Sequence, residues 1–232
     1  MKYLLNWKSY LFIAFILIAA SVVYSNYASN KANEGVVITQ HTKGNTDAGV
    51  VLTEYSDFQC PACGQFYPVV KSLMDQYGDK MALEYKHFPL ITLHQFAVPA
   101  AKAAEAAGQQ GKFWEMHDKL FENQSVWSAQ GVTNPRPYFD QYAEELGLDM
   151  DLFAQHYSAS MIGDHIQEQF NEARQLGLTG TPSFYLNGER LEFSTFEEFT
   201  GKIEAAIGIT PVDASTTATT NAKDKEDVVF GF

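Results

Sequence analysis

Two cysteines are the residues of this chain whose type and spacing point most directly to chemistry. Cys60 and Cys63 are the only two in the sequence, and Pro61 and Ala62 separate them. Two thiols at this spacing allow thiol–disulfide exchange, in which one thiolate attacks a disulfide and the other thiol resolves the mixed disulfide. Half of a zinc site and an inert pair are the other interpretations. A tetrahedral zinc site takes four Cys or His ligands, and no histidine pair stands at ligand spacing close to these cysteines, so we expect neither metal nor cofactor.

A strand and a helix are expected to place the first cysteine at a helix N-terminus. Val50–Tyr55 is apolar and β-branched, which predicts a buried strand. Pro61 suits the first position of a helix, and apolar residues then recur every three or four positions until Gly78 ends it. Unpaired N–H groups and the helix dipole favour a thiolate at such a start. We therefore expect Cys60 to be the attacking sulfur and Cys63 the less exposed, resolving thiol.

The remaining elements predict an α/β fold in which a helical block separates two halves of one sheet. In chain order, strands are expected at Val36–Gln40, Val50–Tyr55, Met81–Phe88, Ser183–Leu186 and Arg190–Phe193, and helices at 61–77, 95–107, 112–122, 135–146, 149–176 and 196–207. The first strand–helix–strand set predicts a βαβ unit with a parallel strand pair. Asn187-Gly188 is typical of the turn of a hairpin. The helical insertion is expected over about residues 90–178.

The front of the chain is apolar. Residues 10–24 carry no charge and follow Lys2 and Lys8. With its polar flank, residues 10–28, the segment reaches the length of about 20 residues that spans a bilayer. We expect a transmembrane anchor there, with residues 1–9 as a cytoplasmic stub because lysines favour the inner side. A cleavable signal peptide, whose apolar core is about 7–15 residues long, is the alternative, and both interpretations export the rest of the chain.

Composition separates the body of the chain from its ends and excludes one class of partner. Residues 29–47 are rich in Asn, Lys, Thr and Gly and are expected to be a linker. Residues 211–232 lack a periodic apolar pattern and are expected to be a disordered tail, which leaves residues 48–210 as the folded domain. The net charge of the chain is −12. Nucleic-acid binders need clustered Lys and Arg, so we expect no nucleic-acid partner.

Several motifs beyond the cysteine pair carry a family resemblance. They are Glu54-Tyr55-Ser56-Asp57-Phe58-Gln59-Cys60-Pro61-Ala62-Cys63, His87-Phe88-Pro89-Leu90, Gly111-Lys112-Phe113-Trp114, and Gly180-Thr181-Pro182-Ser183-Phe184 leading to Asn187-Gly188. With these motifs, residues 44–208 resemble the thioredoxin superfamily, specifically exported disulfide oxidoreductases of the DsbA type. The resemblance implies a thioredoxin fold interrupted by a helical domain, in agreement with the order of elements expected above.

The resemblance also implies roles for residues outside the cysteine pair. It implies a cis peptide between Thr181 and Pro182 that faces the cysteines, with the Thr181 backbone pairing with an extended client segment. It implies that Glu54 is a buried carboxylate near the resolving thiol and handles its proton, the alternative being a solvated carboxylate at a strand edge. The chain departs from the pattern at Pro61-Ala62, because the best-known oxidases carry Pro-His there. Alanine gives the attacking thiolate no hydrogen-bond donor, so a strongly oxidising potential does not follow from the resemblance.

Other polar residues near these motifs are expected to be structural. Asp57 is predicted to cap or brace the loop before the first cysteine. His87, His94 and His117 are predicted to be structural hydrogen-bonding residues.

The sequence thus favours an enzyme, a thiol–disulfide oxidoreductase with one membrane pass and its catalytic domain on the extracytoplasmic side of the cell membrane. We expect it to form disulfides in exported client proteins, with a membrane redox protein as a further candidate partner. Two alternatives stay open. One is a reductase or isomerase that receives electrons from a membrane partner, and the other is a non-catalytic binding module whose disulfide is static.

Overall fold

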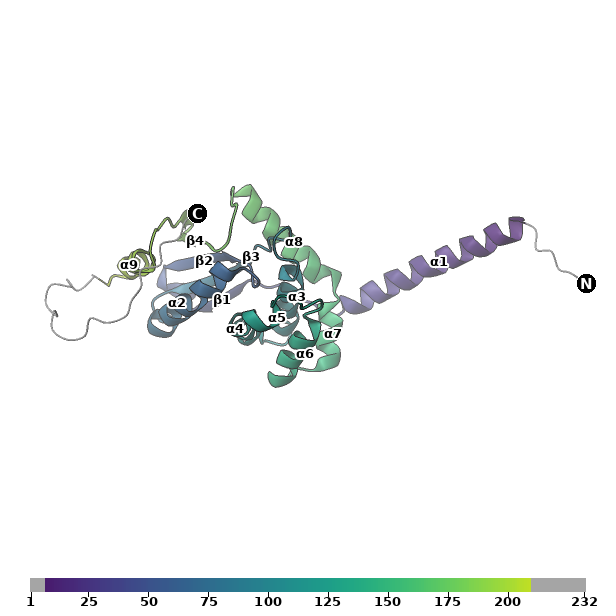
Figure 1. The fold of residues 1–232 in the computed structure, drawn as a ribbon, viewed down its shortest axis with the longest axis horizontal. Coiled ribbons are helices and arrows are strands. Elements are labelled where there is room, and N and C mark those ends of the chain that lie inside the picture. The colour runs from purple at the N-terminus through teal and green to yellow at the C-terminus, as the bar shows by residue number, and fades with distance from the viewer. Residues whose placement is uncertain (1–6, 210–232) are drawn as a thin grey trace, which may run out of the picture.

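The computed structural model describes residues 7–209. The predicted tail over residues 211–232, and most of the predicted cytoplasmic stub, lie outside the described residues. The elements in chain order are α1 (Trp7–Ala32), β1 (His41–Gly44), the 3-10 turn η1 (Thr46–Ala48), β2 (Val51–Ser56), α2 (Pro61–Tyr77), β3 (Ala82–His87), α3 (Ala97–Gly108), α4 (Phe113–Glu122), α5 (Gln124–Trp127), α6 (Arg136–Glu145), α7 (Met150–Tyr157), α8 (Ser160–Gln175), β4 (Ser183–Leu186), β5 (Glu189–Arg190) and α9 (Phe196–Ala206). Figure 1 shows a sheet with helices beside it, a block of further helices, and α1 projecting from that block.

A five-stranded sheet in the order β1-β3-β2-β4-β5 forms the centre of the fold. β2 and β3 are parallel and joined by α2, which is the predicted βαβ unit, and the other strand pairs are antiparallel. Side chains alternate between the two faces of a strand. Leu52 and Glu54 of β2 therefore face the side of α2 and α9, while Tyr55 packs on the opposite side against α8.

The helical insertion consists, within the described chain, of the six helices α3 to α8 between β3 and β4. α3 is its central helix and packs against α4, α6, α7 and α8. The alanines on it, among them Ala100, Ala103 and Ala104, have no exposed surface, and such small side chains let neighbouring helices approach closely. The hydrophobic core of this block also includes Phe58, Cys60, Cys63 and Tyr85, and a second core lies between the sheet, α2 and α9.

The predicted single helical stretch over 149–176 is wrong in one respect. α7 ends at Tyr157 and α8 begins at Ser160. Between them, Ala159 has an extended backbone with φ −65° and ψ 130°, and this residue turns the chain into α8. No Gly or Pro stands at this break, so the local sequence gives no sign of it.

Two predicted strands also have different bounds in the structure. Residues 36–40 form no strand, and the first strand begins at His41 instead. The backbone of Val37 bonds to a side chain in place of a strand: its N–H donates to Gln109 Oε1 at 2.8 Å, and its carbonyl accepts from Gln109 Nε2 at 3.1 Å. The last strand ends at Arg190 rather than at residue 193, although the Leu191 N–H still donates to the Phe184 carbonyl at 2.9 Å.

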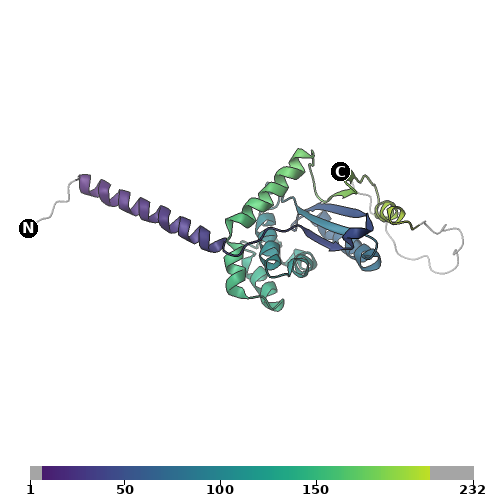
Figure 2. The ribbon, with the colours of Figure 1, turned by 180° about the vertical axis from the view of Figure 1, so that it is seen from behind.

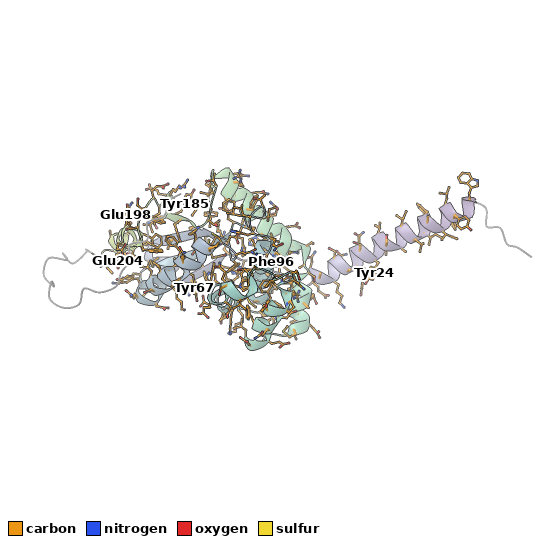
Figure 3. The ribbon with its side chains drawn as sticks, in the orientation of Figure 1. Tyr24, Tyr67, Phe96, Tyr185, Glu198 and Glu204 are labelled. Carbon is orange, nitrogen blue, oxygen red and sulfur yellow. The ribbon has the colours of Figure 1, made fainter. Side chains whose placement is uncertain are left out.

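α1 stands apart from the body of the molecule. Figures 1 and 2 show it as one straight helix that leaves the helical block on the side away from α9. Its stretch Tyr10–Ala32 has a mean hydropathy of 1.9, and none of it is buried. Tyr24, labelled in Figure 3, is 72% exposed. The helix begins before and ends after the segment 10–28 expected from the sequence.

Candidate active site

Cys60 lies at the N-terminus of α2, in the last position before Pro61. Its backbone is extended, with φ −70° and ψ 122°, and its carbonyl accepts a helical hydrogen bond from the Gly64 N–H at 3.1 Å. The Cys60 thiol donates to the carbonyl of Thr181 at 3.3 Å. Cys63 lies one turn further along the helix and has no exposed surface. Both cysteines are free thiols.

The surroundings make the two thiols unequal. Interaction with the Cys63 thiol lowers the pKa of Cys60 most, and the Thr181 side chain and two N–H groups of the helix start lower it further against the effect of burial, to about 6. Burial raises the pKa of Cys63 well above its ordinary value, and the neighbouring Cys60 sulfur adds to this rise. At neutral pH, Cys60 is therefore mostly the nucleophilic thiolate, while Cys63 keeps its proton.

Glu54 is a buried carboxyl on β2, not a solvated one at a strand edge. Its side chain is 3% exposed and faces α2, the helix that carries Cys63. Burial raises the pKa of Glu54 to about 7, with the Ser56 side chain offsetting part of the rise. The charge of Glu54 in turn raises the pKa of Cys63. A carboxyl that titrates near neutral pH beside a thiol that must lose a proton suits a general base. That role stays a prediction.

The loop before β4 forms the opposite wall of the site. The Thr181–Pro182 peptide bond is cis, as the resemblance implies. The Ser183 hydroxyl donates to the Gly180 carbonyl at 2.8 Å and closes the loop on itself. Beside this loop lies a groove of about 220 Å³, lined by residues 179–184 and 190–193. The groove and the Cys60 sulfur therefore meet at Thr181.

Asp57 braces the loop before the cysteines, as predicted. One of its carboxylate oxygens accepts from the Gln59 N–H at 2.8 Å. The other accepts from the Leu90 N–H at 2.9 Å and from His94 Nδ1 at 2.7 Å. The bond to Asp57 raises the pKa of His94, and the nearby Cys60 adds to this rise while burial opposes it. Asp57 thus fastens the segment that follows β2 to the segment that follows β3.

Gln124 is a structural residue of the site that the sequence analysis missed. From α5 in the helical insertion, its Nε2 donates to the carbonyls of Phe58 and Cys60 at 2.7 and 2.8 Å. Gly64 leaves room for it, since a Cβ at that position would stand 2.5 Å from Gln124 Oε1. A glycine inside a helix destabilises it by about 0.5–1 kcal/mol relative to alanine, so Gly64 was the one sequence signal of a close approach. It did not tell which residue approaches.

A second buried polar cluster lies between the sheet and the insertion. Glu105 of α3 accepts hydrogen bonds from His41 and His87 at 2.9 and 2.8 Å, and His165 lies 3.9 Å from the same oxygen. Although burial acts in the opposite direction, these bonds lower the pKa of Glu105 to about 2. His87 is therefore a hydrogen-bonding residue, as expected. In the part of the chain that the structure describes, no group of His, Cys, Asp and Glu is arranged to hold a metal ion.

A family comparison agrees with this fold and site. The sequence model of a family described as thioredoxin matches residues 37–205, most of the chain. The chain belongs to the thioredoxin family. Among curated proteins, it is 40% identical over 150 residues to a Na(+)/H(+) antiporter, NhaA 1, from Salinispora arenicola. That match covers 65% of this chain and 22% of the antiporter, so the chain spans less than a quarter of the relative's length.

Solved structures place this member of the thioredoxin family among DsbA-like folds. A thioredoxin-like oxidoreductase from Silicibacter pomeroyi is 28% identical with a TM-score of 0.60, covering 72% of this chain and 91% of that one. BdbD from Bacillus subtilis, in its oxidised form, is 20% identical with a TM-score of 0.62, covering 75% and 94%. Alpha-DsbA1 from Wolbachia pipientis is 22% identical with a TM-score of 0.63, covering 74% and 92%. The fold is thus a thioredoxin domain with a helical insertion, as predicted.

Proposed function

We propose that this chain is a membrane-anchored thiol–disulfide oxidoreductase that forms disulfides in exported proteins through Cys60 and Cys63. The observation that carries the proposal is the inequality of the two sulfurs. Cys60 has a lowered pKa and lies at a helix start against the Thr181 carbonyl, whereas Cys63 is fully buried with a raised pKa. An attacking thiolate next to a shielded resolving thiol is what dithiol exchange requires. The 28% identical relative named as a thioredoxin-like oxidoreductase supports the same chemistry.

The proposed reaction consists of two exchanges. A client thiolate attacks the Cys60 sulfur of the oxidised protein, the Cys60–Cys63 bond breaks, and Cys63 leaves as a thiolate that takes up a proton. A second client thiolate then attacks the client sulfur of the mixed disulfide, and Cys60 leaves as a thiolate. The client dithiol loses two electrons as its disulfide forms, and the enzyme disulfide gains them. The lowered pKa of Cys60 speeds the second exchange, because a more acidic thiol leaves faster.

The groove beside the cis peptide is proposed to hold the client. Its volume is about 220 Å³, and its lining includes Thr181, whose carbonyl lies 3.3 Å from the Cys60 sulfur. A client segment in extended conformation would pair with the Thr181 backbone, as strands are added to a sheet, and so bring its cysteine to Cys60. Pro182, which follows in the same wall, would shape this contact.

α1 is proposed to anchor the domain in the membrane. The helix is 26 residues long and carries many exposed apolar side chains, Phe12, Phe15 and Ile18 among them. At about 1.5 Å per residue its length of roughly 39 Å exceeds a hydrocarbon core of about 30 Å. A helix that is apolar on all sides and contacts no core is typical of a membrane span. A membrane redox protein that reoxidises the cysteine pair would lie in the same membrane.

Equilibration with glutathione tests the proposal. The full chain in detergent is held in buffers of graded glutathione potential, its thiols are alkylated, and the fraction of Cys60–Cys63 disulfide is measured by mass. A reduction potential above about −200 mV, toward the values of DsbA and protein disulfide isomerase, supports the oxidase. A value toward the roughly −270 mV of thioredoxin would indicate a reductase instead. If no exchange occurred within hours, the pair would be a static disulfide and the proposal would fail.

A further inference from the structure

A narrow cavity connects the buried carboxyl of Glu54 with the surface of α4. Its volume is about 10 Å³, which is about the room that one water molecule needs. Its lining includes Lys43, Glu54, Lys71, Trp114, His117 and Asp118. Of these residues Glu54 is buried, whereas Lys71 and Asp118 form a partly exposed ion pair at 3.5 Å. The cavity thus lies between a buried carboxyl and partly exposed charged groups, and it shares no lining residue with the client groove.

His117 lines this cavity, and one of its ring nitrogens has no hydrogen-bond partner among the described residues. The residue is 6% exposed, and its Nε2 makes no hydrogen bond with any described residue. Its ring is held in place by edge contacts with Phe58, Tyr85 and Phe121, at centroid distances of 5.6, 5.1 and 5.0 Å. Buried polar atoms are nearly always hydrogen-bonded to protein or to ordered water. Because Nε2 has no hydrogen-bond partner among the described residues, we expect it to bond to a water in the adjacent cavity.

The other ring nitrogen determines which state His117 adopts. Its Nδ1 lies 3.0 Å from Asp118 Oδ1. Although burial opposes it, the bond from His117 lowers the pKa of Asp118, so the carboxylate is ionised and only accepts. Nδ1 therefore carries the proton, and in the neutral ring Nε2 is left with a free lone pair. Burial lowers the pKa of His117 while Asp118 acts against this, so an imidazolium formed there gives up its proton readily.

We infer that His117 is a proton-relay residue that links Glu54 to solvent through one water in this cavity. The inference rests on the proposed dithiol chemistry. When the reduced pair is reoxidised, the Cys63 thiol loses its proton to the Glu54 carboxylate and the new thiolate attacks the Cys60 sulfur of a mixed disulfide. The bond between Cys60 and the sulfur of the oxidising partner breaks as the Cys60–Cys63 bond forms. The partner leaves as a thiolate and has gained the two electrons that the cysteine pair has lost. The proton moves from Glu54 through the water to His117 Nε2, while the Nδ1 proton leaves toward Asp118 and solvent. During client oxidation the proton moves along the same path in the opposite direction, and Glu54 passes it to the Cys63 thiolate.

The pH dependence of this path is set by groups from five elements. The charged or titratable residues that face His117 or share its cavity are Lys43 of β1, Glu54 of β2, Tyr85 and His87 of β3, Tyr67 and Lys71 of α2, and Asp118 of α4 itself. Lys43 and His87 disfavour a charged imidazole, and Asp118 favours it. This balance keeps the relay neutral at rest and still able to accept a proton.

The test measures the step in which Cys63 gives up its proton. Reduced full-length protein in detergent is mixed with glutathione disulfide, quenched with acid, and the decay of the Cys60–glutathione mixed disulfide is followed by mass. His117→Asn keeps a donor close to the place of Nδ1 and removes Nε2. We expect it to slow the decay at pH 7 by at least about 10-fold, since general acid–base transfer typically contributes about 10²–10⁴-fold. Asp118→Asn, on the partly exposed side, should slow it too and covers the case in which the first variant does not fold.

Three comparisons separate a relay from a structural role. The reduction potential should stay that of the wild type, because a relay changes rates and not equilibria. Glu54→Gln should slow the same step, and the double variant Glu54→Gln/His117→Asn should be no slower than Glu54→Gln alone. His156→Asn, in another buried histidine with an unpartnered nitrogen, should leave the decay unchanged. A wild-type decay rate in His117→Asn, a shifted potential, or slowing that multiplies with Glu54→Gln would overturn the relay. Failure of the wild type to exchange would instead refute the proposed function.

Discussion

At the residue scale, one turn of α2 separates two sulfurs with opposite acid–base behaviour. The Cys63 thiol, then Thr181 and helix N–H groups, stabilise a thiolate at Cys60, while Cys63 has burial and two nearby negative groups that disfavour one. The chain reaches this inequality without a histidine at position 62. The Cys63 thiol, Thr181 and backbone N–H groups therefore stabilise the thiolate without a donor at position 62.

Alkylation should distinguish the two cysteines directly. With a pKa of about 6, Cys60 should react with iodoacetamide well below the roughly 8.5 of a free thiol, and Cys63 should not react in that range. Cys63→Ser should trap clients as mixed disulfides through Cys60, and Cys60→Ser should trap few. Ala62→His should lower the Cys60 pKa further and make the disulfide more oxidising, because stabilising the thiolate favours the reduced form. Mass spectrometry of the labelled peptides shows which cysteine is alkylated first. Alkylation of Cys63 before Cys60 would contradict these roles.

Glu54→Gln should stabilise the fold above neutral pH. The folded pKa of about 7 exceeds the ordinary 4.5, so the folded protein binds more protons than the unfolded chain between these values. Stability therefore falls as pH rises from about 4.5 to 7, by about 3 kcal/mol for a shift of this size. The neutral amide does not carry this penalty. Denaturant unfolding at pH 5 and pH 8 should show the advantage of the variant growing at pH 8, and an equal difference at both would contradict a carboxyl that titrates in this window.

At the element scale, polar side chains add to the apolar contacts of Phe58 and Tyr85 in connecting the insertion to the sheet near the site. Gln124 of α5 bonds to the carbonyls on either side of Gln59, and Gln59 Oε1 accepts from the Phe96 N–H at 2.6 Å ahead of α3. Glu105 of α3 meets histidines from β1 and β3. The helical block thereby fixes the backbone of the loop that presents Cys60.

Glu105→Gln should destabilise the protein and change its response to acid. Glu105 is fully buried and accepts hydrogen bonds from two histidines, and a hydrogen bond to a charged group contributes about 1.5–3 kcal/mol. Its folded pKa of about 2 lies below the ordinary 4.5, so its contribution is complete above pH 4.5 and is lost as pH falls toward 2. Unfolding free energies from pH 7 to pH 3 measure this. Glu145→Gln, in an exposed pair with Lys119, is the matched control and should leave stability nearly unchanged.

Periodicity and end signals predicted most elements of the fold, and long-range polar contacts account for what they missed. Pro61 and Gly78 bound α2 as expected, because proline and glycine act locally on the backbone. The break at Ala159 has no such residue. Gln124 lies 64 residues from its partner Cys60, so nothing near either residue in the sequence relates them. The cavity that His117 shares with Glu54 likewise brings together residues distant in the sequence, and it exists only once α4 packs against the sheet and α2.

At the scale of the whole molecule, the segment after α1 is fastened to the helical insertion. Asn33 Oδ1 accepts from the Met161 N–H at 3.1 Å, in the first turn of α8, whose own preceding residue offers no side-chain cap. Gln155 Nε2 donates to the Glu34 carbonyl at 3.0 Å. Figure 2 shows the sheet and α9 on the far side of the insertion from α1. The insertion would therefore lie nearer the membrane than α9 does.

The anchor leads to a prediction about the mature protein. If α1 spans the membrane, the chain should remain in the membrane fraction after carbonate extraction, with its N-terminal segment attached, and added protease should reach the catalytic domain only from the extracytoplasmic side. The exposed apolar surface of α1 drives its insertion into the membrane. Ile16→Lys combined with Ala19→Lys should therefore release the protein, because each charge at the centre of a span costs about 2.5–3.5 kcal/mol. Asn33→Ala is the matched control: it removes the contact to α8 but leaves the span, and should stay membrane-bound. Recovery of a soluble exported form beginning near residue 22 would show that the helix is a cleaved signal peptide, and the dithiol chemistry would then act free of the membrane.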